Sequence, residues 1–362
     1  MNELQTKLNL VRKYLQQHNF DALVIEQVGN FAWLTGGAAS FVNLAVTTGE
    51  SSLVITQEKQ YIITNNIEAP RLENEEGLST PDWDLQIYPW YQPRDFLSQR
   101  CSGMKLAADV NLPNAVNVHA DLIQMRMNLL PSEQEKFRQL CKATANAMDA
   151  AIRNVKPGQT EFEIAALLAK ETFDRDIWPI VNLVAVDDRI YKYRHPHPTH
   201  KIMEKYAMLV LCGRKYGLVS SLTRLVHLGA LPDELSRKAK SVSILDAAYI
   251  SATKPGTPIS TIIKYAQSIY KEEGYPDEWR LHHQGGPAAF DSREFTANND
   301  SPGIVQAGQA YAWNPSITGV KSEDTILVHE NGNEILTQIH GWPETAITIN
   351  GETIARPEIL LI

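Results

Sequence analysis

The sequence has 362 residues, long for one domain and sufficient for two, and its 43% hydrophobic content allows a sizeable globular core. A formal net charge of −8 excludes the broad basic face that is typical of nucleic-acid-binding proteins. The apolar runs are no longer than a β-strand, so we expect no membrane partner. The negative net charge likewise predicts no nucleic-acid partner.

The amino-terminal residues mix charged side chains with leucines at helical spacing. This pattern predicts an amphipathic helix rather than a secretory signal. The three cysteines, Cys101, Cys141 and Cys212, are scattered and form no Cys-x-x-Cys pair. Such usage is typical of a reducing compartment, where thiols pack as small apolar side chains, and it predicts a cytoplasmic protein.

The first third of the chain alternates strand and helix patterns. Runs rich in β-branched and aromatic residues predict strands at Asp21–Ile25, Asn30–Gly36, Phe41–Thr48, Ser52–Thr56, Gln60–Thr64 and Met104–Asp109. Helices are predicted at Glu68–Glu76, Arg94–Arg100 and Val118–Leu129. The alternation predicts an α/β domain over residues 1–130. It has no glycine-rich phosphate loop and no cluster of His, Cys or carboxylates, so we expect it to shape a site or an interface.

A long amphipathic helix is predicted to open the second part of the chain. Ser132 and Glu135 have the spacing of a capping box, in which a hydroxyl and a carboxylate satisfy free amides at a helix start. The predicted buried stripe consists of Phe137, Leu140, Cys141, Met148, Ile152 and Val155. A Lys-Pro-Gly break ends this helix, and Thr160 with Glu163 forms a second capping box that starts the next one.

The pattern of this helix junction occurs twice. The run MDAAIRNVKPG at Met148–Gly158 has a counterpart, LDAAYISATKPG, at Leu245–Gly256. Each copy leads into a strand-rich segment, Tyr206–Gly229 in the first and Gln309–Val328 in the second. The repetition predicts an α+β domain over residues 131–362, built from two related halves with a cleft between them.

The stretch LHHQGGPAAFDSRE at Leu281–Glu294 is a candidate site. Its paired glycines let the backbone approach a ligand or take positive φ, and imidazole transfers protons near neutral pH. A surface turn that carries two histidines would have the same composition, so the rest of the chain has to decide between a site and a turn.

Seven short motifs, in the same order, resemble the creatinase / aminopeptidase P / prolidase family (peptidase family M24), which has the pita-bread fold. They are NFAWLTG at Asn30–Gly36, KPGQTEFE at Lys156–Glu163, RHPHPT at Arg194–Thr199, SLTR at Ser221–Arg224, HQGG at His283–Gly286, NP at Asn314–Pro315 and KSEDTILV at Lys321–Val328. The resemblance covers nearly the whole chain. It implies an α/β N-terminal domain, a duplicated creatinase-like α+β domain and a homodimer.

The resemblance also assigns metal positions. Peptidases of this family bind two divalent metal ions through two Asp, one His and two Glu. The first Asp falls near Val210-Leu211 and the second at Ser221, so both carboxylates are missing here. His283 keeps the histidine, Asn314 replaces the first Glu, and Glu323 keeps the second. Because hard divalent ions depend on carboxylate charge, we expect no metal cofactor.

The residues that remain suit hydrolysis without a metal. His195 matches the histidine that acts as general acid/base in metal-free creatinase. The predicted catalytic residues are His195, His283 and Glu323. The predicted substrate-binding residues are Arg293, Asn314 and His282. We therefore predict a hydrolase of C–N bonds in a small carboxylate-bearing molecule or short peptide, although Arg293 can instead pair with Glu294 and Glu323 can cap a turn.

Two other functions stay open at this point. The chain can be a true Xaa-Pro metallopeptidase that binds Mn or Zn through other ligands. In the run HPHPTH the prolines enforce an extended backbone, on which His195 and His197 project to one side with His200 nearby. The chain can also be a catalytically silent homologue that binds a peptide or small ligand.

Overall fold

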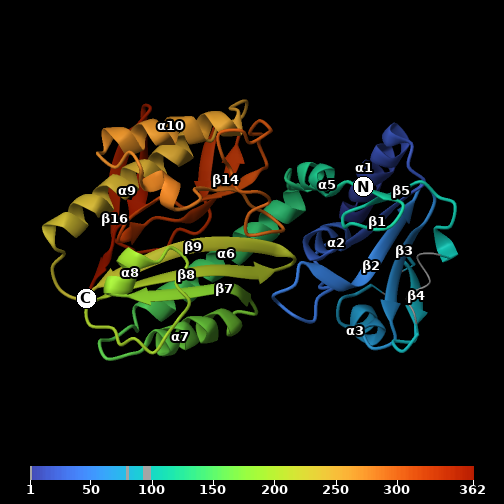
Figure 1. Cartoon of the computed structure of the whole chain (residues 1–362), viewed down its shortest axis with the longest axis horizontal. Coiled ribbons are helices and arrows are strands. Elements are labelled where there is room, and N and C mark those ends of the chain that lie inside the picture. Colours follow the sequence, from blue (N-terminus) through green and yellow to red (C-terminus); the bar gives the residue numbers. More distant parts are fainter. Residues whose placement is uncertain (1, 79–80, 93–98) are drawn as a thin grey trace. The chain divides into compact units, whose positions relative to one another are not determined.

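The computed structural model describes residues 2–78, 81–92 and 99–362, and within them the chain divides into two compact units (Figure 1). The first unit contains the chain up to Arg126 together with Tyr216–Leu218. The second contains Met127–Lys215 and Val219–Ile362. No described helix is both long enough and apolar enough to cross a membrane.

A six-stranded sheet organises the first unit. Its strands are β1 (Ala22–Gln27), β2 (Thr48–Thr56), β3 (Gln60–Asn65), β4 (Asp84–Tyr88), β5 (Leu106–Ala108) and β6 (Ala115–Asn117), in the order β4-β3-β2-β1-β5-β6. The helices described here are α1 (Glu3–His18), α2 (Val28–Thr35), α3 (Ala69–Asn74) and α5 (His119–Arg126). Strand β1 pairs antiparallel with β2 and parallel with β5, so the predicted α/β class is confirmed.

The segment Asn30–Gly36, predicted to be a strand, lies mostly in helix α2, so that prediction is wrong. The Asn30 amide donates to Asp109 Oδ2 at 2.9 Å and accepts from Arg126 Nη1 at 2.7 Å. A short apolar run fits a strand and a buried helix equally well, and these contacts across the chain stabilise the helix. The strand predicted over Phe41–Thr48 is also wrong, because β2 begins only at its last residue.

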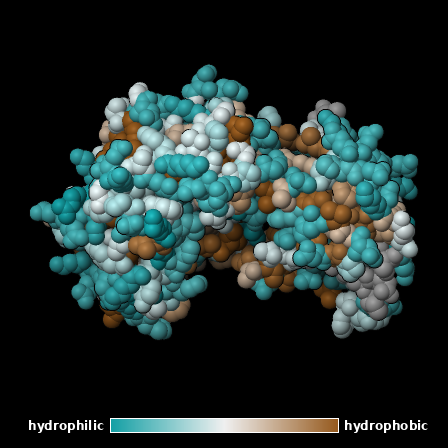
Figure 2. All heavy atoms as spheres, turned by 45° about the horizontal axis from the view of Figure 1, so that its top comes forward, coloured by the Kyte–Doolittle hydropathy of each residue, from teal (hydrophilic) through white to brown (hydrophobic). Residues whose placement is uncertain are grey.

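The remaining predictions for this unit have mixed outcomes. Strands are confirmed at β1, β2, β3 and β5, and helices at α1, α3 and α5. The helix predicted at Arg94–Arg100 lies largely outside the described residues. On the face shown in Figure 2, hydrophobic residues gather on this unit. Its most exposed large apolar side chains include Val42, Ile67, Ile87, Trp90, Tyr91 and Val116.

The second unit consists of two halves with the same plan, two helices followed by a sheet. The first half contains α6 (Pro131–Ile152), α7 (Glu161–Phe173), β7 (Trp178–Val186), α8 (Asp188–Lys192), β8 (Tyr206–Lys215) and β9 (Leu218–His227). The second half contains α9 (Asp233–Ala252), α10 (Ile259–Glu272), the 3-10 turn η1 (Glu278–Leu281), β10 (Gly285–Pro287), β11 (Ala310–Trp313), β14 (Asp324–His329) and β15 (Gly332–Ile335). Short pieces complete it: β12 (Ser316–Ile317), β13 (Val320–Lys321), β16 (Glu344–Ile349), β17 (Glu352–Pro357) and β18 (Leu360–Leu361). The two main sheets have the orders β18-β9-β8-β7 and β10-β11-β14-β15.

The predicted duplication is confirmed at the level of single hydrogen bonds. In the first half Gly158 has φ of 87° and its N–H donates to Met203 O at 2.9 Å. In the second half Gly256 has φ of 88° and donates to Val305 O at the same 2.9 Å. An isolated antiparallel bridge follows each glycine two residues later, at Thr160 and at Pro258. The same backbone device therefore turns the chain from one helix into the next in both halves.

The two predicted capping boxes differ in outcome. The Thr160–Glu163 box is confirmed, because the Thr160 N–H donates to Glu163 Oε2 at 2.7 Å and the Glu163 N–H donates to Thr160 Oγ1 at 3.2 Å. The Ser132–Glu135 box is wrong. Helix α6 begins at Pro131, two residues earlier than that box requires, so Glu133 is the residue that accepts the Leu130 N–H, at 2.7 Å. The predicted buried stripe of α6 is confirmed for every residue named.

Three apolar cores hold the second unit together. One lies between α6–α7 and the sheet β7–β9, and another lies between α9–α10 and the sheet β11–β14. The third joins the halves, since residues of β8 and β9 such as Met208 and Leu225 pack there with Leu245 of α9 and Val320 of β13. The strands of the two halves are thereby brought together.

Candidate active site

The candidate site lies in the second unit, where the two main sheets meet. An antiparallel bridge joins Thr223 of β9 to Glu323, which precedes β14. Trp313 pairs with both Gly285 and Asp324. Extending those registers by one residue places Asn314 between the segment of His283 and the segment of Glu323. Residues far apart in sequence thus come from adjacent strands.

The structure resolves which residue of Val210-Leu211 faces the site. Leu211 belongs to the core beneath α6 and α7, whereas Val210 belongs to the core between the halves. Side chains alternate along a strand, so Cys212 points to the same face of β8 as Val210. Cys212 Sγ lies 3.3 Å from Ser221 Oγ, which places Val210 on the side of Ser221.

Glu323 is clamped by two cations. Its Oε1 lies 2.7 Å from Arg293 Nη2, and its Oε2 lies 2.7 Å from Lys321 Nζ and accepts from Thr223 Oγ1 at 2.6 Å. The three charged side chains expose 10% or less of their surface. Arg293 Nη1 also donates to Ser221 Oγ at 3.1 Å. We call Arg293, Glu323 and Lys321 the ion triad.

The ion triad sets the protonation of Glu323. Burial alone would raise the pKa of this carboxyl, but Lys321 and Arg293 together lower it far below its ordinary value. The two cations exceed the single carboxylate by one positive charge. Sequence reasoning missed Lys321 and Thr223, although Lys321 stands two residues before Glu323, a spacing that places two side chains on one face of extended backbone.

Three histidines form a second cluster beside the triad. His195 Nε2 and His282 Nε2 are 3.0 Å apart, and the rings of His282 and His283 stack with centroids 4.3 Å apart. Each offers a ring nitrogen, and the three nitrogens lie within 4.8 Å of one another. His195 is exposed, His283 is partly buried and His282 is buried. The structure therefore makes His282, predicted only to bind substrate, the direct partner of His195.

All three imidazoles are held in the neutral form. Burial lowers the pKa of His282 to about 2, with a further contribution from the nearby Lys321 charge. Burial and Arg293 lower the pKa of His283 to about 4. The pKa of His195 is also lowered, by burial and then by Lys321. A neutral imidazole has one nitrogen that accepts a proton and one that donates, so the His195–His282 contact can pass a proton between rings.

The segment that carries His195 is fastened to the first half by Glu161. This fully buried carboxylate accepts from the Thr199 N–H at 2.8 Å, from Thr199 Oγ1 at 2.7 Å and from the Val186 N–H at 2.9 Å, and it also pairs with Arg189. Hydrogen bonds from Thr199 and the ion pair with Arg189 outweigh burial and lower the pKa of Glu161. Sequence reasoning did not single out this residue.

The run HPHPTH does not gather its own histidines. The ring of His200 packs instead on Phe162, with centroids 5.2 Å apart. Among the described residues, the one group of three potential metal-ligand side chains is His195, His282 and His283. A relocated metal on His195, His197 and His200 therefore has no support in this geometry.

Several polar atoms of the site lack a hydrogen-bond partner within the chain, although they are buried. They are His282 Nδ1, His283 Nδ1, Arg293 Nε and Asn314 Oδ1. Buried polar atoms without partners are rare, and a group of them indicates a place where ligand or water completes the bonds. Predicted catalytic and binding residues thus converge on one region, with Glu323 turned towards the cations rather than towards a histidine.

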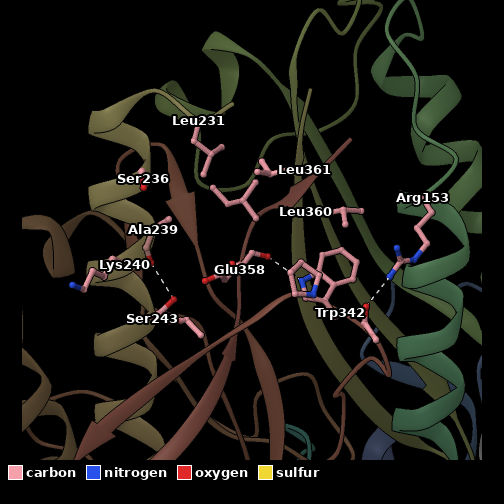
Figure 3. Close-up of a pocket in the computed structure, with 14 residues that line it drawn as sticks. Arg153, Leu231, Ser236, Ala239, Lys240, Ser243, Trp342, Glu358, Leu360 and Leu361 are labelled. Carbon is pink, nitrogen blue, oxygen red and sulfur yellow. Dashed lines mark hydrogen bonds between the residues drawn. The ribbon is translucent and has the colours of Figure 1, made fainter. Parts of the chain in front are cut away.

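Two cavities frame the choice of site. One, of about 590 Å³, is lined by His282, His283, Trp279 and Asn298 among others. The larger, of about 670 Å³, lies between α9, the end of α6 and β18, where Trp342 and Leu360 line it (Figure 3). The larger cavity is lined by none of the clustered histidines, whereas the smaller one is lined by His282 and His283 but not by His195 or the ion triad.

The sequence model of Metallopeptidase family M24 matches residues 135–330, more than half of the chain, and that of the Creatinase/Prolidase N-terminal domain matches residues 7–139. This chain belongs to peptidase family M24. Its fold is the pita-bread fold predicted from the motifs, with a creatinase-type N-terminal domain. The family resemblance inferred from sequence is thereby confirmed.

Relatives of this M24 chain match it over almost their whole length. An uncharacterized peptidase of Staphylococcus epidermidis is 28% identical, covering 92% of this chain and 99% of the relative. A Xaa-Pro dipeptidase of Pyrococcus horikoshii is 22% identical, covering 93% and 98%. The crystal structure of a recombinant prolidase from Thermococcus sibiricus superposes with a TM-score of 0.81 at 16% identity, covering all of both chains. The chain therefore shares the fold of this prolidase structure.

The residues at the five family metal positions do not fit a pair of divalent ions. Val210 and Ser221 supply no charge, and Asn314 supplies only a dipole. Glu323 is the one carboxylate among them, and both its oxygens already contact cations. A divalent ion placed beside it would face the positive charges of Arg293 and Lys321. We therefore assign such an ion no role in the proposed chemistry.

Proposed function

We propose that this M24 member hydrolyses a C–N bond in a small carboxylate-bearing substrate without a metal cofactor. The observation that supports this proposal best is the pairing of His195 with His282 at 3.0 Å beside the ion triad. The site then combines a proton-transfer group with a source of positive charge. In a metal-dependent hydrolase, a metal ion and its bound water would supply these two functions.

In the proposed reaction His195 is the general base and then the general acid. Its neutral imidazole removes a proton from water as the water oxygen bonds to the substrate carbon. The C–N bond then breaks, and the imidazolium returns the proton to the leaving nitrogen, so the proton count balances. His282 accepts or donates at the inner nitrogen of His195 and keeps it in the required tautomer, a role close to that of an orienting group in a triad.

The positive charge of the ion triad is proposed to bind the substrate carboxylate. Arg293 Nε has no partner in the chain and can donate to that carboxylate, whereas the unpartnered Asn314 Oδ1 is an acceptor and suits an N–H group of the substrate. A charge-assisted hydrogen bond to carboxylate is shorter and stronger than a neutral one. In this arrangement Glu323, predicted from sequence to be catalytic, holds the two cations in place.

The test is turnover of Xaa-Pro dipeptides and guanidino acids by chelator-treated protein of measured metal content. We expect turnover that is unchanged by chelator and by added Mn²⁺, and that is lost in His195→Ala. Metal at one ion per chain together with chelator-sensitive peptidase activity would overturn the proposal. Absence of turnover, with a ligand that raises the melting temperature, would favour a catalytically silent binder.

A second candidate function is supported by the three-histidine cluster. Three neutral imidazoles within 4.8 Å are suitable ligands for Zn²⁺ or Cu²⁺, so a mononuclear metallopeptidase is the alternative. The chelator arm of the same assay distinguishes it from the metal-free reaction.

A homodimer remains a proposal that the family resemblance supports, and light scattering of the purified protein at micromolar concentration tests it.

A further inference from the structure

The ion triad lies where the family resemblance places ligands for metal. The guanidinium of Arg293 bridges Ser221 Oγ at 3.1 Å and Glu323 Oε1 at 2.7 Å. These two residues stand at the second Asp position and at the second Glu position of the family. One cationic side chain therefore fills the space between two family ligand positions.

The ammonium of Lys321 takes the other half of the remaining ligand. It contacts Glu323 Oε2 at 2.7 Å, so both carboxylate oxygens have a cation within contact distance. Thr223 donates to Oε2 as well, which leaves few lone-pair directions for any other partner. Lys321 itself exposes only 6% of its side chain, and a buried ammonium requires such pairing.

The charge balance differs in sign from that of a metal centre. Four carboxylates and two divalent ions would be neutral together, whereas one carboxylate with two monovalent cations leaves one positive charge. A positive site repels a divalent cation at contact distance and attracts an anion. Loss of the Asp carboxylates and presence of the cations are thus complementary changes.

We infer that Arg293 and Lys321 are this chain's internal replacement for the divalent ions of the family, so that the site excludes metals and admits anions. The inference concerns binding and stands apart from the proposed reaction. If only the carboxylates were missing, putting them back would restore metal binding. Because Arg293 and Lys321 also occupy the ligand positions, metal binding cannot be restored until these cations are removed.

A set of three altered proteins separates these two causes. The first restores ligands, with Val210→Asp, Ser221→Asp and Asn314→Glu. The second removes cations, with Arg293→Gln and Lys321→Gln, and the third combines all five changes. Co²⁺ binding to chelator-treated protein is followed by visible absorption and calorimetry, and the shift in melting temperature with Co²⁺ is a readout that needs no activity.

We expect Co²⁺ to bind the five-change protein at least about 100-fold more tightly than the ligand-restored protein, because the new carboxylates of the latter pair with Arg293 and Lys321. Equal affinity in these two proteins would overturn the inference. Arg224→Gln added to the restored ligands is the matched control. Arg224 is even more buried than Arg293 and pairs with Asp324, outside the five positions, so its removal should create no site.

The wild-type chain provides a second test should the altered proteins fail to fold. Wild type is equilibrated with Co²⁺ and desalted. Co²⁺ retained by wild type and lost in Glu323→Gln would overturn the inference. No retention, or retention lost only in His195→Gln, supports it, since Glu323 then holds no metal. Retention lost only in His195→Gln would count against the proposed metal-free reaction but not against the inference that Arg293 and Lys321 replace the metal ions. Failure of the proposed function and failure of this inference are therefore distinguishable.

Discussion

At the scale of single residues, the contact between His195 and His282 determines the proposed chemistry. We expect His195→Gln and His282→Gln each to lower kcat by roughly 10²- to 10⁴-fold, the usual contribution of a positioned acid/base group. The measurement is kcat with chelator present, on a substrate that the wild type turns over. His200→Gln is the control, because His200 packs on Phe162 outside the cluster. Equal losses in all three proteins would contradict the assignment.

The neutral histidines also make a prediction about acid stability. The folded pKa values of His282 and His283, about 2 and about 4, lie below the ordinary value of 6.5, so the unfolded chain binds more protons between those limits. Their contribution is therefore complete above pH 6.5 and is lost as the pH falls towards the folded values. Each group can cost up to about 1.4 kcal/mol per pH unit.

The measurement is urea unfolding at pH 7.5, 6.0 and 5.0. The free energy of unfolding of wild type should fall with pH, and His282→Gln should flatten that slope over the same range. A slope unchanged by His282→Gln would show that other groups cause the acid sensitivity.

Single residues also show what sequence reasoning could and could not reach. His283 and Glu323 were found because the family motifs contain them, and Arg293 was found because it lies in the candidate stretch Leu281–Glu294. Lys321 was overlooked although it lies in a quoted motif, since its meaning depends on a partner carboxylate that is oriented by the bridge to Thr223. The contact of His282 with a residue 87 positions away cannot be read from local spacing.

At the scale of elements, the short strand β10 depends on its glycines. Gly285 has φ of +98°, and a Cβ there would lie 2.1 Å from Ala312 O of the neighbouring strand. We expect Gly285→Ala to destabilise the protein by at least about 2 kcal/mol, through backbone strain and a steric clash together. Urea unfolding measures it. Gly332→Ala is the matched control, because Gly332 has φ of +136° in β15 but open space around it. A similar decrease in the free energy of unfolding for both proteins would show that the close approach of Gly285 to Ala312 O does not contribute to stability.

The segment that holds His195 depends on one buried carboxylate. Glu161→Gln should weaken its ion pair with Arg189 and its bonds to Thr199, with a cost of about 3 kcal/mol as for other broken buried pairs. Since these bonds fix the backbone next to His195, kcat should fall as well. Chemical denaturation and kcat are measured together, with Thr199→Val as the milder comparison. A stable Glu161→Gln protein with full kcat would refute this role.

Element prediction succeeded where local signals sufficed and failed where distant contacts decided. The box at Thr160 and Glu163 needs only neighbouring residues, and it was found. In helix α2, Asn30 is held by Asp109 and Arg126, which lie far along the chain. Because these contacts cannot be read from local sequence, the segment was predicted to be a strand. The start of α6 was misplaced because Pro131 shifts the first turn.

At the scale of the whole molecule, a buried charge network ties the second unit together. Arg356 of β17 contacts Asp246 of α9 and Asp324 of β14, each at 2.5 Å, and Arg224 of β9 completes the group. Arg356→Leu should cost about 3–5 kcal/mol, since two buried carboxylates lose their shared partner. The free energy of unfolding measures this cost. Lys254→Ala, which breaks the exposed pair with Glu352, should cost under about 1 kcal/mol. Equal costs would contradict the weight given to burial.

The duplication was the part of the architecture most accessible from sequence, because both junctions contain Asp-Ala-Ala followed by Lys-Pro-Gly. Which half supplies which side chain to the site was not accessible. That depends on strand register, such as the pairing of Trp313 with Asp324, and on the alternation that turns Val210 towards the core between the halves and Leu211 towards the core with α6 and α7.

The matching junctions at Gly158 and Gly256 have a consequence for how this chain diverged. The glycine conformations and buried strands that define each half are kept in both copies, yet the metal positions are not kept equally. The first half has lost both acidic side chains, at Val210 and Ser221, while the second keeps His283 and Glu323. The second half supplies His282, His283 and the ion triad, but the first half still contributes His195, so both copies carry groups of the candidate site. A doubled scaffold thus lets the two copies differ in their site residues while both keep the same helix junction.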